Sequence, residues 1–291
     1  MYFAVKTLFD SKTNNATYVV WDTQSKNCLI IDSLLNLDLA AGKIFTEAAD
    51  NLISFITENG LNAQWILETH IHADHLSAAS YLKQKLGGRI GVSAGVLEVQ
   101  RHFKTFYGLG NEFSSDGSQF DHLFADGEMF SVGNLEVKVM HTPGHTPSCA
   151  TYVIDENAFT GDTFFMPDSG TARCDFPGGS PKELYKSLRK ILALPPETRQ
   201  FINHDYGCGG SRDFCWETSV AEQYRSNVHM NGKTTEDQFI SMRRERDSTL
   251  AVPRLILPAI QVNIRAGNLP AADQNGKHYL RIPINSLYKT L

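Results

Sequence analysis

Thr69-His70-Ile71-His72-Ala73-Asp74-His75 is the stretch that decides the fold of this chain. It places three imidazoles and a carboxylate directly after the apolar run 63–67, which predicts a buried strand. The histidines are therefore expected on the turn at the carboxyl end of that strand, where α/β sheets usually carry their chemistry. Neutral imidazole is the commonest metal ligand, and its pKa of about 6.5 leaves it able to coordinate at neutral pH. A polar turn whose histidines only bond backbone carbonyls is the alternative, and the density of the motif favours a metal site.

Three later segments repeat the pattern of a predicted strand followed by a histidine or an aspartate. The strand around 135–140 runs into His141-Thr142-Pro143-Gly144-His145, where we take His145 as the ligand and His141 as a strand-end residue. Two further strands, 158–160 and 199–203, lead into an aspartate and a histidine. An isolated Asp would be interpreted as a cap, but here it is the third strand end of a series. The candidate metal-binding set is His70, His72, Asp74, His75, His145, Asp162 and His204.

Length and composition indicate a soluble globular protein with a small-molecule partner. The chain has 291 residues, 42% of them hydrophobic and 20% charged, which are ordinary values for a globular domain. Its net charge of −5 argues against a nucleic-acid partner bound through a basic face. We find neither a basic leader followed by an apolar run nor a window of about 18 apolar residues, so we expect no membrane association and a cytoplasmic location.

The five cysteines are an odd number without a Cys-x-x-Cys pair. This disfavours a disulfide framework and a structural zinc site. We expect most of them to be buried thiols, because free cysteine behaves as a small hydrophobe.

Periodicity and turn residues predict alternating strands and helices. Strands are expected at 17–21, 28–31, 63–67, 89–93, 151–154, 158–160 and 199–203, and a pair of strands at 130–140 around Gly133-Asn134. Helices are expected at 46–59, at 77–86, at 181–192 after a Ser180 N-cap, at 219–229 and from Thr235, whose capping box is closed by Gln238. The stretch 101–121 lacks clear periodicity and is expected to be an irregular loop.

No linker, low-complexity tract or internal repeat separates independent domains. The change to helical character after 215 predicts one domain at 1–215, which contains the candidate metal-binding set, and a C-terminal helical extension at 216–291, packed on the same domain. His229 and His278, both in the extension, are expected at the surface.

The candidate ligands resemble those of the metallo-β-lactamase fold superfamily. Segment 69–75 fits its T-H-x-H-x-D-H motif, and the later candidates stand where its later ligands occur. This resemblance implies an α/β (α+β) fold, the αβ/βα four-layer sandwich, with the metal site at one edge between the sheets.

Segments around the candidate ligands resemble one family within that superfamily, the persulfide dioxygenases (sulfur dioxygenases). They are Pro143-Gly144-His145-Thr146-Pro147 followed by Cys149, Arg173-Cys174-Asp175-Phe176, and His204-Asp205-Tyr206. The tail 254–267 resembles the bacterial branch of the family, so the likeness covers nearly the whole chain. Ser148 departs from the glycine expected at its position.

The family resemblance implies one Fe(II) per chain, held by His70, His145 and Asp162. Two histidines and a carboxylate form the facial triad of non-haem iron oxygenases, which leaves positions open for substrate and dioxygen. The remaining residues, His72, Asp74, His75 and His204, would orient these ligands or hold a second metal. The implied reaction oxidises glutathione persulfide with O2 to sulfite and glutathione.

Three residues outside the ligand set are candidates for substrate contacts. Arg173 is expected to pair with a glutathione carboxylate, Tyr206 to hydrogen-bond the bound sulfur or oxygen, and Arg265 to contact the glutathione moiety. The bland alternatives are an ion pair between Arg173 and Asp175 and a packed tyrosine.

Two other functions remain open. A glyoxalase II-like thioester hydrolase would use the same seven side chains to hold two metals, although that family tends to have a glycine and a histidine where this chain has Pro147-Ser148-Cys149. A non-catalytic metal-binding partner or sensor is the third possibility. We expect a homodimer in each case.

Overall fold

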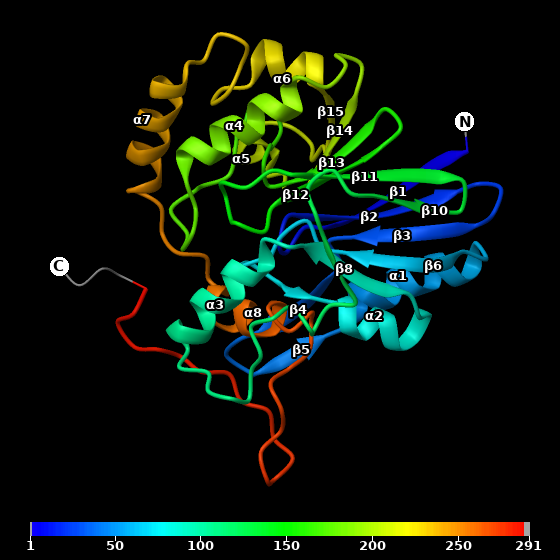
Figure 1. The fold of residues 1–291 in the computed structure, drawn as a ribbon, viewed down its shortest axis with the longest axis vertical. Helices are drawn as coiled ribbons and strands as arrows, with labels where there is room; N and C mark the ends of the chain where they lie inside the picture. Colours follow the sequence, from blue (N-terminus) through cyan, green and yellow to red (C-terminus); the bar gives the residue numbers. More distant parts are fainter. Residues whose placement is uncertain (1, 288–291) are drawn as a thin grey trace.

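The computed structural model describes residues 2–287 and contains two facing β-sheets with helices on their outer sides (Figure 1). In spatial order the first sheet consists of β1 (Phe3–Asp10), β2 (Asn15–Asp22), β3 (Asn27–Ile31), β6 (Asn62–Leu67), β8 (Arg89–Ser93) and β9 (His122–Phe124). The second consists of β10 (Met129–Val132), β11 (Leu135–His141), β12 (Ala150–Ile154), β13 (Asn157–Gly161), β14 (Arg199–Ile202) and β15 (Glu217–Ser219). A small third sheet has the order β5 (Lys43–Phe45), β4 (Leu34–Asp38) and β7 (Leu76–Ser77).

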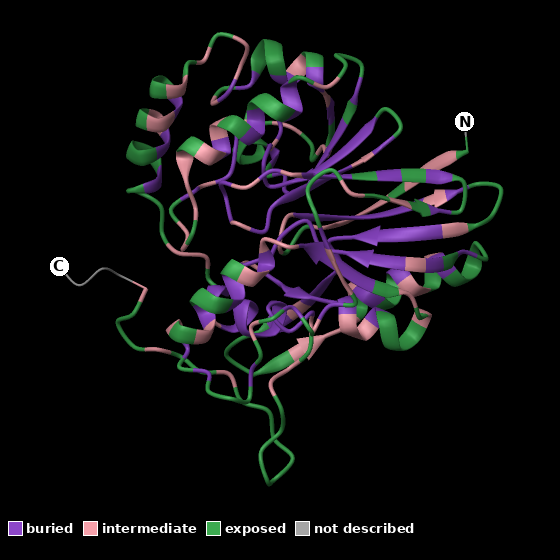
Figure 2. Cartoon of the chain, viewed as in Figure 1, coloured by how far each residue is buried: buried purple, intermediate pink, exposed green. Residues whose placement is uncertain are grey.

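The helices form the two outer layers, as the αβ/βα prediction requires. The layer on the first sheet contains α1 (Glu47–Glu58), α2 (Ala79–Leu86), α3 (Val96–Phe106) and α8 (Ile256–Asn263), whose apolar residues share one core cluster with that sheet. The layer on the second sheet contains α4 (Pro181–Leu192), α6 (Val220–Ser226) and α7 (Glu236–Asp247). The short α5 (Gly207–Gly210) lies in a loop after β14. In Figure 2 the strands are mostly buried and the outward sides of the helices are exposed.

Strand alternation explains why the core has separate layers. Tyr18 and Val20 of β2 point between the two sheets, where they join Phe159 and Phe201, whereas Val19 points toward the helices on the outer side. Successive side chains of a strand face opposite sides, so a strand that is apolar at every position must be covered on both faces. The continuous apolar runs in the sequence therefore follow from the four-layer arrangement.

Two helix starts have the predicted caps. The Glu183 backbone N–H donates to Ser180 Oγ (3.3 Å) at the start of α4. At the start of α7, Thr235 and Gln238 form the complete reciprocal capping box.

The prediction of an irregular loop at 101–121 is wrong in its first part, because α3 continues to Phe106. The buried side of α3 is formed by Val96, Val99, Gln100 and Phe103, at the spacing of an amphipathic helix. The apolar pattern of this helix starts at Val96, five residues before the predicted loop. The segment 101–121 therefore contains only the last turns of the helix.

The segment after residue 215 packs on both sides of the sandwich. β15 pairs with β14 at the edge of the second sheet, while α8 belongs to the helical layer of the first. Among the described helices, none has the length and apolar character needed to cross a bilayer. All five cysteines are free thiols, and three of them are buried, as expected.

Candidate metal centre

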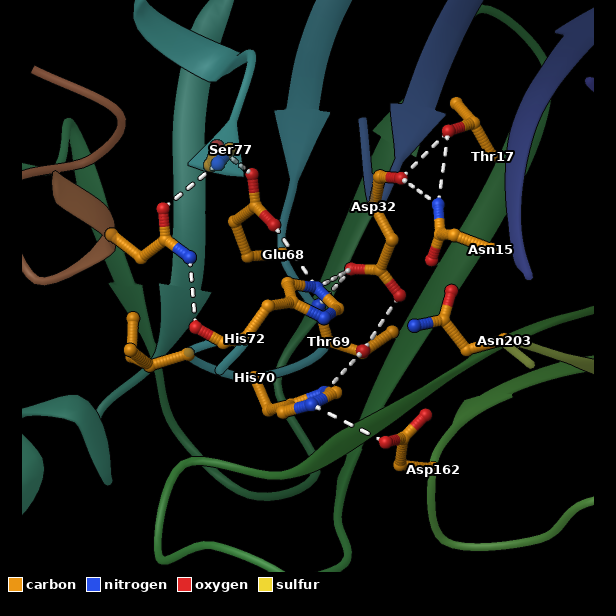
Figure 3. Close-up of polar contacts among 12 residues, drawn as sticks. Asn15, Thr17, Asp32, Glu68, Thr69, His70, His72, Ser77, Asp162 and Asn203 are labelled. Carbon is orange, nitrogen blue, oxygen red and sulfur yellow. Dashed lines mark hydrogen bonds and ion pairs between the residues drawn. The ribbon is translucent and has the colours of Figure 1, made fainter. Parts of the chain in front are cut away.

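Four strand ends meet at one edge of the sandwich and bring the candidate ligands together. The segment 70–75 follows β6, His145 follows β11, Asp162 follows β13 and His204 follows β14. Figure 3 shows His70 and Asp162 facing each other across this edge. His141 lies outside the cluster, as predicted, with Nε2 2.9 Å from the Phe124 carbonyl oxygen.

One group of donor atoms is formed by His70, His145 and Asp162. The Nε2 atoms of His70 and His145 lie 3.7 and 3.6 Å from Asp162 Oδ2, and all three side chains are buried. Ligand atoms that each lie about 2.0–2.2 Å from a shared ion are separated by roughly 3–4 Å. The three side chains could therefore hold one metal ion.

A second group lies on the other side of Asp162. His204 Nε2 is 3.7 Å from Asp162 Oδ1 and 3.3 Å from Asp74 Oδ2. The donor atoms of His72, Asp74 and His75 lie within 4.8 Å of one another and could also hold an ion. Asp162 thus directs one oxygen toward each group.

Most of the imidazoles are anchored through Nδ1, which leaves Nε2 free to face the cluster. Nδ1 of His145 lies 2.6 Å from the Arg173 carbonyl oxygen, and Nδ1 of His204 lies 3.1 Å from that of Asn14. Carbonyl oxygens only accept hydrogen bonds, so Nδ1 carries the proton and Nε2 presents its lone pair. Such partners fix both the tautomer and the orientation of a ligating histidine.

His72 is held in the opposite orientation by two buried carboxylates (Figure 3). Its Nε2 lies 3.1 Å from Asp32 Oδ1 and 3.3 Å from Glu68 Oε2. Burial alone would lower the pKa of His72, but Asp32 and Glu68 outweigh this effect and raise it well above its usual value. Carboxylates only accept hydrogen bonds, so Nε2 carries a proton toward them. Nδ1, which has no partner among the described residues, is the ring nitrogen that faces the cluster.

Asp32 and Glu68 are site residues that our sequence reasoning missed. Asp32 also accepts from the Thr69 backbone N–H and hydroxyl, each at 2.7 Å, and Glu68 accepts from the Ser77 hydroxyl at 2.5 Å. Both follow a buried strand directly, Asp32 after β3 and Glu68 after β6. The rule that found Asp162 would have found them.

The chemistry of the donor set fits a metal ion. Three buried atoms, His72 Nδ1, His75 Nε2 and Asp162 Oδ1, have no hydrogen-bond partner among the described residues, which is rare for buried polar groups. Burial lowers the pKa of His75 to about 4 and, together with neighbouring imidazoles, lowers that of His70 well below its usual value. Both rings are therefore neutral at pH 7, with lone pairs available for coordination.

Gly161 permits the close approach of Asp162 to the histidine turn. Its φ of 55° lies in the left-handed region, and a Cβ here would lie 2.4 Å from Thr69 Oγ1. Only glycine tolerates both the conformation and the contact.

The His70, His145 and Asp162 group opens into a cavity of about 650 Å³, within the range of roughly 300–1,000 Å³ typical of small-molecule sites. Its wall includes Tyr206 and Arg173. Tyr206 is 48% exposed, and its hydroxyl has no partner among the described residues. Partial burial and the nearby Asp162 and Asp74 raise its pKa above the usual value, so it remains a hydrogen-bond donor.

The positions of the other predicted contact residues differ from expectation. The Arg173 guanidinium makes a bidentate ion pair with Asp175 (2.6 and 2.7 Å) and a third hydrogen bond to the Ala251 carbonyl. The alternative considered for Arg173, an ion pair with Asp175, is therefore the one that is observed. Arg265 does not line the cavity; it is buried, donates to the Gln261 carbonyl and stacks on Phe113. Its position does not support a substrate contact.

His229 corrects the expectation that both histidines of the extension lie at the surface. It is only partly exposed and lines the cavity, whereas His278 is exposed as predicted. The sequence analysis placed His229 at the end of the helix predicted at 219–229, and no local signal connected it to the cavity.

The fold and the site define a metal-binding αβ/βα sandwich with a small-molecule cavity. Residues 12–204 match the family model of the metallo-beta-lactamase superfamily, and the chain belongs to that superfamily.

Individual relatives carry different names. The chain is 51% identical over 271 residues to "Glyoxylase B2" of Dictyostelium discoideum, covering 92% of each protein. It is 29% identical over 268 residues to the mitochondrial persulfide dioxygenase ETHE1 of Homo sapiens, covering 90% of this chain and 88% of that one. The crystal structure of ETHE1 from Myxococcus xanthus superposes with a TM-score of 0.73 at 28% identity and covers 92% of this chain and 100% of its own.

Proposed function

We propose that this protein is a glutathione-dependent persulfide dioxygenase with one Fe(II) per chain, held by His70, His145 and Asp162. The observation that carries the proposal is this pair of histidines and one carboxylate at the base of an open cavity. It is the ligand set of non-haem iron oxygenases, which keep positions open for substrate and O2. The likeness to the persulfide dioxygenases over nearly the whole chain supports the same reaction.

Bound ferrous iron would supply the open positions and the electron transfer between sulfur and O2 that this chain's own side chains lack. Glutathione persulfide, O2 and water give glutathione, sulfite and two protons, with four electrons passing from sulfur to O2. The Tyr206 hydroxyl stays protonated and donates a hydrogen bond to a substrate atom beside the ligands. Phe165 and Phe176 line the cavity, and the Phe176 ring centroid lies 5.2 Å from that of His145, so apolar surface adjoins the ligands.

A thioester hydrolase of the glyoxalase II type is the second candidate, and a specific observation favours it. The donors His72, Asp74 and His75, together with the oxygen that Asp162 directs toward His204, suffice for a second ion. Two ions about 3.5–4 Å apart generate a hydroxide nucleophile for acyl transfer. The name of the Dictyostelium relative agrees with this alternative.

One experiment separates the two candidates. The protein is purified without oxygen, its metal content is measured, and oxygen uptake is followed after addition of glutathione persulfide. The dioxygenase is expected to contain about one iron per chain and to consume oxygen while forming sulfite. Two metals per chain with S-lactoylglutathione hydrolysis and no oxygen uptake would establish the hydrolase instead.

A further inference from the structure

A second part of the cavity wall comes from α7 and from the loops on either side of it. Val228, His229, Arg243, Arg246 and Leu250 line the same cavity as the metal-ligand candidates. These residues all lie beyond the 12–204 segment that defines the superfamily. They are therefore residues through which this chain can shape its own substrate preference.

Two of the three arginines that line the cavity are already neutralised. Arg173 is paired with Asp175, and the buried Arg243 is paired with Asp247 one turn further along α7. The guanidinium of Arg246 forms no ion pair or hydrogen bond with any residue in the range 2–287, and the residue is exposed. Arg246 therefore contributes a positive charge without a counter-charge to the cavity.

His229 places a neutral hydrogen-bond donor in the same wall. Its Nδ1 accepts from the Thr171 backbone N–H (2.9 Å) and lies 3.4 Å from Arg243 Nη1, which can only donate. The proton of the neutral ring must therefore be on Nε2, on the edge that is not held by Thr171. Burial, followed by the charges of Arg243 and Arg246, lowers the pKa of His229 to about 4, so the ring is uncharged at neutral pH.

The protein holds this wall in place before any ligand binds. Gly170 has φ 88°, and a Cβ there would lie 2.1 Å from His229 Nδ1, so the ring occupies space that only glycine leaves open. Asn227 accepts from the His229 backbone N–H (2.9 Å) and donates to the Gly170 carbonyl (3.0 Å). Asp247 accepts from the Cys174 backbone N–H (3.0 Å), which ties α7 to the loop that carries Arg173. Preorganised groups bind a ligand at a smaller entropic cost.

We propose that Arg246, with His229 beside it, forms the subsite that binds a carboxylate of the glutathione moiety. The inference rests on the proposed function for the identity of the substrate, because the thiol end of glutathione would lie at the metal ligands. Glutathione carries two carboxylates, and a guanidinium matches the planar geometry of either one. Arg246 takes the role that the sequence suggested for Arg173, whose fork is already occupied by Asp175.

The direct test is the binding of glutathione itself, measured by calorimetry on the whole 291-residue chain. Arg246→Ala is expected to weaken binding about 10- to 100-fold, as the loss of a charged hydrogen-bonded contact does. Arg244→Ala is the matched control, because Arg244 lies on the same helix, is exposed and does not line the cavity. It is expected to change the affinity less than about twofold. Equal affinities of the two variants, or no binding of glutathione to the unmodified protein, would overturn the proposal.

Glutathione monoethyl ester, in which the glycyl carboxylate is esterified, identifies the group that is bound. If Arg246 binds the glycyl carboxylate, the unmodified protein binds the ester as weakly as Arg246→Ala binds glutathione. If the ester binds normally while Arg246→Ala still loses affinity, the γ-glutamyl carboxylate is the partner. Either result supports the subsite.

The subsite and the proposed function can fail separately. If both variants consume oxygen with glutathione persulfide and Arg246→Ala has the same KM as Arg244→Ala, the dioxygenase function is supported and the subsite is excluded. If the protein instead hydrolyses S-lactoylglutathione without oxygen uptake, and the KM is raised only in Arg246→Ala, the dioxygenase function is excluded and the subsite is supported.

Discussion

Both donor groups depend on Asp162, because its two carboxylate oxygens face different histidines. Oδ2 faces His70 and His145, and Oδ1 faces His204. Substituting Asp162 therefore affects any metal arrangement that the site can hold.

Asp162→Ala is expected to lose most of the bound metal and all activity, since it removes an anionic donor from the cluster. Metal content per chain, measured after anaerobic purification, tests this. His278→Ala is the control because His278 is exposed and, within residues 2–287, its ring bonds only the Pro270 carbonyl. Equal metal loss in the two variants would show that the site has been misassigned.

Asp32 stabilises the fold as well as the site, since it accepts from His72 and from two groups of Thr69. Asp32→Ala leaves the Thr69 backbone N–H unpaired and removes one of the two carboxylates that face the buried His72 imidazole, so we expect the free energy of unfolding to fall by about 3 kcal/mol. Urea unfolding of the metal-free protein measures the change. Asp38→Ala, at an exposed position, should cost less than about 1 kcal/mol. Comparable losses would mean that the buried network contributes little to stability.

His229 gives the fold an acid sensitivity that is separate from the metal site. Its pKa is about 4 in the folded protein and about 6.5 in the unfolded chain, so the unfolded chain takes up a proton first as the pH falls. Its contribution to stability is fully present above pH 6.5 and is lost progressively toward pH 4. We expect the Tm of His229→Gln to fall less between pH 6.5 and 5 than that of the unmodified protein. A His278→Gln control should keep the original slope; identical slopes in all three proteins would contradict the prediction.

At the scale of elements, searching for histidines and aspartates at the ends of apolar strands found the candidate ligands but not the residues that hold them in place. Every ligand candidate follows an apolar strand, and parallel or neighbouring strand ends meet at one edge of a sandwich. Asp32 was missed because a single carboxylate after a strand resembles an ordinary turn residue. The α7 wall was missed because contacts between α7 and the loop 165–176 join segments far apart in sequence, and neither segment alone carries a motif.

Helix α8 supports the histidine turn through a single side chain at its C-terminal end. Asn263 Nδ2 donates to the carbonyl oxygens of His72 and His75, both at 2.8 Å, and Oδ1 accepts from the Ser77 backbone N–H at the same distance. The helix therefore fixes the backbone of the turn, although none of its residues is a ligand candidate.

Asn263→Asp keeps the size of this side chain but removes both donors, so we expect metal affinity to fall about 10- to 100-fold, as for other residues that orient ligands. Competition with a chelator of known affinity measures the change. Asn268→Asp is the control, since Asn268 contacts Arg265 and Ser80 and not the histidine turn. An affinity as high as that of the control would show that the turn holds its shape without the clamp.

At the scale of the whole molecule, the predicted sandwich is confirmed, whereas the division at residue 215 stays a prediction. The described part of this extension, residues 216–287, contributes β15, three helices and part of the cavity wall. Chemical periodicity along the chain predicts layers well, because each strand and helix must bury its own apolar side. It does not predict which distant segment covers which face.

A chain shortened to residues 1–215 is expected to be insoluble or unfolded, because α7 and α8 cover apolar surfaces of both outer layers. Soluble yield and far-ultraviolet circular dichroism, compared with the full chain, measure this. A folded 1–215 fragment that retains metal would show that the extension is a separable appendage.

The bond between His145 and the peptide oxygen of Arg173 has a practical consequence for mutagenesis. Any amino acid at position 173 supplies the same oxygen, so replacing the guanidinium leaves the imidazole oriented as before. Side-chain substitutions at this position would therefore test the ion pair with Asp175 but not the carbonyl oxygen that orients His145. To weaken that oxygen as a hydrogen-bond acceptor, the amide between residues 173 and 174 would have to be replaced by an ester.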